Sequence, residues 1–230
     1  MVGNSQIPSF FMLLTLIIAS CMITPLPSSD LENIEAEYGG TWDTDGQDTC
    51  EDLEINKHGE AYTVGTSIPS PGNLDISLVK WNSEANVTWV RVMHGINSSY
   101  PRANARAVET FGDSVFVVGG CQNLLNDVRM LLAKWYSNGT LAWYVISEET
   151  REGTDLGIAI DGSIYVVGLA NVTQPGLFLA KFNSSNGHRE WMKRFSGYYT
   201  GYLPRLEIST DDHVITFTSS TVIRWKLNGE

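Results

Sequence analysis

One pair of apolar strands recurs along this chain of 230 residues. The first strand of the pair ends in Gly in three of its copies, and the second ends in Lys or Arg followed by an aromatic residue. The first strands are 61–65, 115–119, 164–168 and 214–218, and the second strands end at Trp81, Trp135, Phe182 and Trp225. A repeat of about 40 to 50 residues built from short strands is typical of a propeller blade. Because such a unit cannot bury both of its faces alone, the copies must stack on one another.

Three copies contain four strands each, over about 50–95, 103–149 and 153–197. The fourth copy begins near Leu203 and has only three strands before the sequence ends. A segment upstream of the first copy, residues 33–40, ends in glycine, which matches Gly95 and Gly197 after the last strands of the first and third copies. We therefore predict an all-β fold over residues 33–230: a small β-propeller of about four blades with four antiparallel strands each, closed by the N-terminal strand. The alternative is that the chain is an arc that completes a larger propeller by association.

The first 29 residues contain no charged side chain. Residues 10–23 are apolar apart from Thr15, Ser20 and Cys21, a length that suits the core of a signal peptide. The run can also be extended to residues 7–26 as an uncleaved membrane anchor. The sequence Ile-Ala-Ser-Cys21 resembles the lipobox of bacterial-type lipoproteins, which implies lipidation of Cys21. We predict export to an extracellular or cell-surface location, with membrane association through this segment left open.

Asn-x-Ser/Thr sequons support export. They lie at Asn86, Asn97, Asn138, Asn171 and Asn183. Three of them fall in the turn before the last strand of a repeat, where a glycan would meet solvent. The alternative is that turns are rich in Asn, Gly and Ser for conformational reasons alone.

Two cysteines remain beyond the N-terminal segment. Cys50 opens the first strand of the first repeat, and Cys121 follows the second strand of the second repeat. The antiparallel order places both at the same face of adjacent blades, so an exported protein could join them in a disulfide. Two free thiols are the alternative.

The third repeat resembles two known families. Asp161–Gly168, followed by Lys181-Phe182 and a Trp strand that ends at Gly197, is similar to the SBBP repeat of bacteria and archaea. The turn from Asn183 through Gly187 to Trp191 is similar to the signature of PQQ-like propeller repeats. Both resemblances imply a propeller fold. Neither implies catalytic residues, because the shared positions build the blade.

Composition and motifs restrict the chemistry. A net charge of −11 argues against nucleic acid as a partner. The common catalytic and metal-binding motifs are absent from the sequence. The run Asp43-Thr-Asp45-Gly-Gln-Asp48 can wrap oxygen ligands around calcium, although its spacing departs from that of an EF-hand. A solvated acidic loop is the other interpretation, so we expect no cofactor and keep calcium as the one candidate.

The loops between blades combine aromatic and charged residues on one face of the predicted ring. The candidate ligand-binding residues are Trp42, Tyr100, Arg102, Tyr198, Tyr199, Tyr202 and Arg205. Aromatic rings beside charged hydrogen-bonding groups suit protein or glycan recognition. We therefore predict a non-enzymatic binding module for a protein or glycan. The alternatives are an exported glycan-active enzyme that uses paired carboxylates at the channel mouth, a quinoprotein-like propeller, and a structural cell-surface module.

Overall fold

The computed structural model describes residues 41–42, 46–69, 73–170, 176–196, 203–209, 213–218 and 220–226. The chain divides into two units, Met1–Glu37 and Tyr38–Glu230, and every described residue belongs to the second. The predicted export segment with Cys21 and the predicted closing strand 33–40 therefore lie outside the described residues. None of the described residues forms a helix long and apolar enough to span a membrane.

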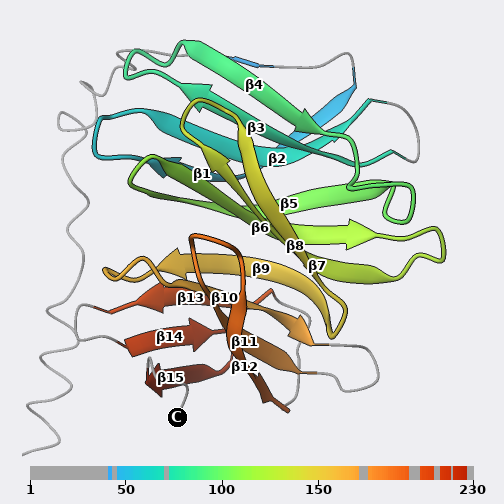
Figure 1. Ribbon diagram of the computed structural model, residues 1–230, viewed down its shortest axis with the longest axis vertical. Coiled ribbons are helices and arrows are strands. Elements are labelled where there is room, and N and C mark those ends of the chain that lie inside the picture. Colours follow the sequence, from blue (N-terminus) through green and yellow to red (C-terminus); the bar gives the residue numbers. More distant parts are fainter. Residues whose placement is uncertain are drawn as a thin grey trace, which may run out of the picture. The chain divides into compact units, whose positions relative to one another are not determined.

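The described residues form four antiparallel sheets, as predicted (Figure 1). The first sheet contains β1 (Gln47–Ile55), β2 (Ala61–Ile68), β3 (Asp75–Trp81) and β4 (Val87–Met93). The second contains β5 (Arg102–Phe111), β6 (Ser114–Gln122), β7 (Val128–Tyr136) and β8 (Leu141–Ser147). The third contains β9 (Thr150–Ile158), β10 (Ile164–Ala170), β11 (Leu177–Phe182) and β12 (Arg189–Phe195). The fourth contains β13 (Arg205–Ile208), β14 (His213–Phe217) and β15 (Val222–Lys226).

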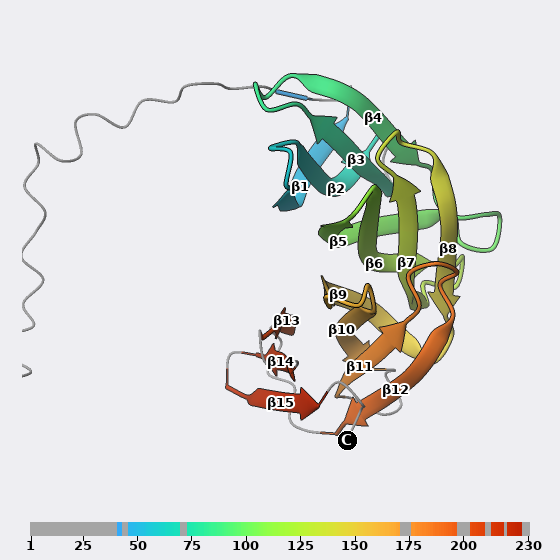
Figure 2. The ribbon, with the colours of Figure 1, turned by 60° about the vertical axis from the view of Figure 1, so that its left-hand side comes forward.

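Within each sheet the strands pair in the order in which they occur along the chain, which is the arrangement of a propeller blade. Packing contacts run from the first blade to the second, the second to the third and the third to the fourth. Figure 2 shows β1, β5 and β9 on one side of their sheets and β4, β8 and β12 on the other. The chain is thus a β-propeller of four described blades, and the first strand of each blade is its innermost strand.

Three apolar cores hold neighbouring blades together. The core between the first two blades contains Tyr62 and Leu78 from one side and Val117 and Trp135 from the other. The next two cores repeat this arrangement between later blades. Both faces of the middle strands of the second and third blades are therefore covered, which explains why β6 and β10 are continuous apolar runs.

The recurring Lys and Trp residues reinforce the contact between blades. Lys80 Nζ lies 5.5 Å from the centre of the Tyr62 ring and 2.9 Å from Glu60 Oε1. Trp89 Nε1 donates a hydrogen bond of 3.1 Å to Ser137 O in the next blade. Lys80 Nζ also donates a hydrogen bond of 3.4 Å to Ser137 O, so both side chains bridge the first two blades while the Lys80 charge is paired at a buried position.

A glycine lies within the second strand of each of the first three blades, which continues beyond the predicted end, because the first strand approaches this position closely. The ladder between β5 and β6 shifts register between Ala105 and Ala107, opposite Gly119 and Val118. Comparable shifts occur opposite Gly65 and next to Gly168. A side chain at these positions would overlap the backbone of the bulged strand, so only glycine fits.

The predicted disulfide is wrong, because Cys50 and Cys121 are both free thiols. Cys121 is buried in the core between the first two blades, and burial raises the pKa of its thiol to about 12. Cys50 instead lies in a groove of the first blade beside Trp42 and Trp81. Strand order placed both residues at one end of adjacent blades, but their side chains enter different environments.

Candidate functional site

A cavity of about 510 Å³ lies where the innermost strands of the four blades meet. Its charged lining consists of Asp52, Glu54, Glu109, Asp155, Glu207 and Arg205. The remaining lining is mainly apolar and includes Leu206 and Phe217. The cavity therefore gathers five carboxyl groups and one guanidinium group from four separate parts of the sequence.

Three of the glutamates occupy equivalent positions in their blades. Glu54 pairs in register with Tyr62 of the neighbouring strand, and Glu109 pairs with Phe116 in the same way. Glu207 pairs with Ile215, while the third blade has Gly157 opposite Tyr165. The propeller repeat itself thus brings these three side chains to one level of the cavity.

The two aspartates tie the innermost strands of neighbouring blades together. Asp52 Oδ2 accepts a hydrogen bond of 2.9 Å from Val108 N in the second blade. Asp155 Oδ2 accepts one of 2.8 Å from Leu206 N in the fourth blade, and Asp155 Oδ1 lies 3.9 Å from Arg205 Nη1. Burial raises the pKa of Asp155 to about 6. Both aspartates satisfy backbone donors that would otherwise face the cavity without a partner.

Glu109 is the most strongly perturbed of the glutamates. Burial raises its pKa to about 8, with further contributions from the negative charges of Glu54 and Asp155. Burial also raises the pKa of Glu54, whose Oε1 accepts a hydrogen bond of 3.2 Å from Thr110 Oγ1. Glu109 and Glu207 make no hydrogen bond or ion pair with any described residue. At neutral pH, Glu109 is therefore a protonated acid within a cavity of carboxylates.

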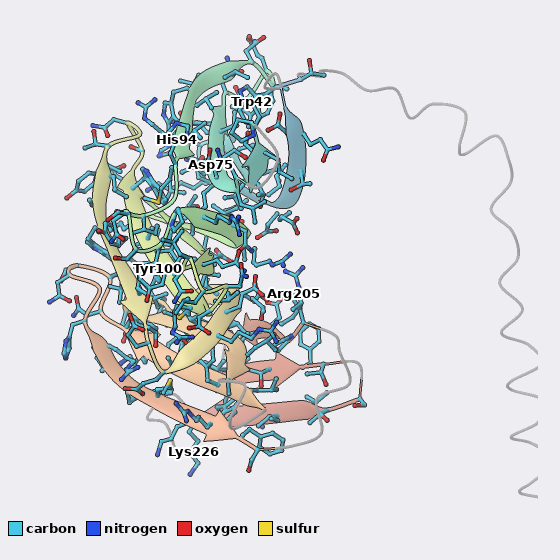
Figure 3. All side chains as sticks on the ribbon, turned by 90° about the vertical axis from the view of Figure 1, so that its right-hand side faces the viewer. Trp42, Asp75, His94, Tyr100, Arg205 and Lys226 are labelled. Atoms are coloured by element: carbon cyan, nitrogen blue, oxygen red, sulfur yellow. The ribbon has the colours of Figure 1, made fainter. Side chains whose placement is uncertain are left out.

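The four predicted ligand-binding residues that the structure describes lie at separate sites (Figure 3). Arg205 lines the central cavity, whereas Trp42 lies in the groove of the first blade. Tyr100 donates a hydrogen bond of 2.8 Å from its hydroxyl to Glu148 Oε1. Arg102 lies in a third pocket. Tyr198, Tyr199 and Tyr202 lie outside the described residues, so their role stays a prediction.

The predicted calcium loop is only partly described. Asp43 and Asp45 lie outside the described residues, and Asp48 begins the first strand. Among the described residues no group of three or more His, Cys, Asp or Glu side chains is placed to hold a metal ion. Calcium binding by this loop stays a prediction.

Asn86, Asn138 and Asn183 lie in the turns before the last strands of their blades, as predicted. Asn86, Asn97 and Asn138 are exposed, Asn183 is half-buried, and Asn171 lies outside the described residues. Asn138 also belongs to a turn that touches the first blade, because Arg91 Nε donates a hydrogen bond of 2.7 Å to Gly139 O. Glycosylation at these positions stays a prediction.

Sequence reasoning missed most of the cavity residues, although a signal was present. The innermost strands read Asp52-Leu-Glu-Ile, Ala107-Val-Glu-Thr, Asp155-Leu-Gly-Ile and Arg205-Leu-Glu-Ile. When these four segments are aligned, three of them have a glutamate at the third position, and three have a charged residue at the first position. Such a repeat on an innermost strand indicates side chains that converge on the propeller axis.

No protein-family model and no curated protein matches the chain. Solved structures similar to it include a protein of unknown function from Bacteroides caccae, at 9% identity and a TM-score of 0.46 over 79% of this chain and 62% of that one. A GH43 endo-arabinanase from Bacillus licheniformis is 16% identical with a TM-score of 0.46, over 83% of this chain and 79% of that one. A GH43 β-xylosidase/α-arabinofuranosidase from a compost metagenome is 11% identical with a TM-score of 0.47, over 77% and 75%. The chain thus spans less than two thirds of the first structure, and membership of the SBBP or PQQ-like families stays a prediction.

Proposed function

We propose that this propeller binds a glycan in its central cavity. The observation that carries the proposal is the convergence of Glu54, Glu109 and Glu207 on one cavity from three blades. Carboxylate oxygens accept hydrogen bonds from sugar hydroxyls, and a protonated Glu109 can donate one. The leucines and Phe217 of the lining offer apolar contact to the faces of a sugar ring. The predicted export of the chain agrees with a glycan ligand.

Glu207→Ala tests this site because the Glu207 side chain is exposed and has no partner among the described residues. We expect the substitution to weaken glycan binding about tenfold, since a hydrogen bond to a charged group is lost. The ligand is first found on a glycan array and binding is then measured by isothermal titration calorimetry. The matched control is Glu84→Ala, at an exposed position in the turn between β3 and β4. Equal affinities for both variants, or no glycan bound by the wild type, would contradict the proposal.

A second function, glycoside hydrolysis, is favoured by the raised pKa of Glu109. Glycosidases use one protonated carboxyl group as the acid and a second carboxylate as the base or nucleophile. Glu109 suits the acid role because its pKa is about 8. Glu207 supplies the second carboxyl group from another blade.

Hydrolysis predicts that the wild type releases reducing ends from the glycan it binds. Glu109→Gln should then lower the rate constant kcat by about a hundredfold, because the amide cannot protonate the leaving oxygen. Binding of the uncleaved glycan should change little. Glu84→Gln provides the control. If the wild type binds a glycan without cleaving it, the hydrolase function is excluded and the binding function stands.

A further inference from the structure

A second pocket, of about 340 Å³, opens beside the N-terminal ends of the innermost strands. Its lining includes Arg102 and Arg106 from β5, Arg151 and Glu152 from β9, and Glu51 from β1. It therefore holds three guanidinium groups and two carboxylates, which leaves an excess of positive charge in a chain whose net charge is −11. We call it the arginine pocket.

Both carboxylates of the arginine pocket face the same arginine. Arg106 Nε lies 2.9 Å from Glu152 Oε1, and Arg106 Nη1 lies 3.4 Å from Glu51 Oε2. Glu152 Oε1 also accepts a hydrogen bond of 2.8 Å from Asn104 Nδ2. With three guanidinium groups against two carboxylates, these five side chains leave one positive charge in excess.

Arg151 is the cation that remains available. It is exposed and makes no hydrogen bond or ion pair with any described residue. Every other arginine in the described part of the chain makes at least one such interaction. Arg102 already has partners, among them Gln122 Oε1 at 3.3 Å and Asn126 Oδ1 at 3.4 Å, so Arg151 is the arginine that a ligand would meet first. An anionic ligand group would therefore find a guanidinium group without displacing an internal ion pair.

The arginine pocket and the central cavity lie along the same strands. Arg106 precedes Glu109 by three positions on β5, and Arg151 precedes Asp155 by four positions on β9. At about 3.3 Å per residue, these backbone positions are separated by roughly 10 to 13 Å along their strands. One extended ligand can therefore reach both. The carboxylates of the cavity repel an anion, so an acidic group on that ligand would be directed to the arginine pocket.

We infer that the arginine pocket recognises the carboxylate of a uronic acid unit in the bound glycan, with Arg151 as the main contact. This inference rests on the proposed glycan-binding function, and it deepens that function by naming the class of glycan. A guanidinium group binds a carboxylate through two parallel hydrogen bonds, which neutral sugars cannot form. The pocket would therefore select acidic over neutral oligosaccharides.

The test compares trigalacturonate with its methyl ester, which removes the negative charges but keeps the sugar rings. The full chain should bind trigalacturonate at least tenfold more tightly, with an advantage that shrinks as salt is added. Arg151→Gln should lower affinity for the acid about tenfold and leave affinity for the ester unchanged. Lys57→Gln, an exposed position in the turn between β1 and β2, removes the same charge elsewhere and serves as the control.

The possible failures are distinguishable. Equal binding of acid and ester by the wild type, or equal losses in Arg151→Gln and Lys57→Gln, overturns the inference but leaves glycan binding standing. If another glycan binds the central cavity and neither trigalacturonate nor its ester binds, the inference is also overturned. If no glycan of any kind binds, the proposed function fails, and the inference fails with it.

Discussion

Gly119→Ala is expected to destabilise the protein by about 3 kcal/mol, whereas the same substitution at the adjacent Gly120 should cost less than about 1 kcal/mol. A Cβ atom on Gly119 would overlap Asn104 O and lie 2.9 Å from Ala105 Cα, both in the backbone of β5. A Cβ atom on Gly120 would meet only side-chain atoms, the nearest being Asn104 Oδ1 at 3.0 Å. Side chains can move by a few tenths of an ångström, but the backbone of a paired strand cannot move without breaking its ladder.

Urea unfolding followed by tryptophan fluorescence measures the two free energies of unfolding. The comparison is controlled internally, because both substitutions add one methyl group to the same strand. Gly168→Ala should behave like Gly119→Ala, since its Cβ atom would overlap Glu152 O. Similar midpoints for Gly119→Ala and Gly120→Ala would show that the bulge in β5 does not require glycine.

The repeat was predictable because the residues that define it act within one hairpin. The glycine faces a bulge in the strand paired with it, and the aromatic residue of the next strand packs between blades. Aromatic residues also contact one another within a blade: Tyr62 of β2 and Trp89 of β4 have ring centres 6.0 Å apart. Phe116 with Trp143 and Tyr165 with Trp191 repeat the contact at 6.1 and 6.0 Å. Because strand pairing and packing within a blade require these residue types, the blade pattern can be recognised in the sequence.

The extent of the first strands was harder to predict. Residues 42–52, 95–106 and 148–155 were expected to be loops, but β1 begins at Gln47, β5 at Arg102 and β9 at Thr150. Innermost strands face a polar cavity on one side, so their sequences lack the apolar runs of the middle strands. The expected loop residues Arg102 and Arg106 therefore belong to a strand.

The central site escaped prediction for a related reason. The sequence suggested paired carboxylates only as a general alternative, because residues such as Glu54 and Glu207 are 153 positions apart. Their meeting depends on the way in which four blades pack side by side and on a register that no single repeat reveals. In a single strand these charged residues look like ordinary solvated positions. The site can be recognised only when all four strands are compared.

Glu109 should make the protein less stable as the pH rises from about 5 to about 9. The pKa of its carboxyl group is about 8 in the folded protein, compared with 4.5 for the unperturbed group. The folded state therefore binds more protons than the unfolded state between these two values, and the free energy of unfolding decreases with increasing pH across that interval. Glu109 contributes no further pH dependence below about 4 or above about 9.

The size of the effect follows from the shift. Each pKa unit corresponds to about 1.4 kcal/mol, so ionisation of Glu109 lowers the free energy of unfolding by up to about 5 kcal/mol. Asp155 acts in the same direction at lower pH, because its pKa is raised to about 6. Wild-type stability should thus decrease in two overlapping steps, with the Glu109 step at the higher pH.

Glu109→Gln isolates the second step, because the amide keeps the shape of the side chain without a titrating proton. The variant should be close to the wild type in stability near pH 5 and clearly more stable than the wild type near pH 9. Urea midpoints measured at intervals of half a pH unit give both curves, and Glu84→Gln at an exposed turn should follow the wild type throughout. Parallel curves for Glu109→Gln and the wild type would mean that Glu109 is ionised at neutral pH. That result would remove the proton on which the acid role in hydrolysis depends, while leaving the cavity as a binding site for glycan hydroxyls.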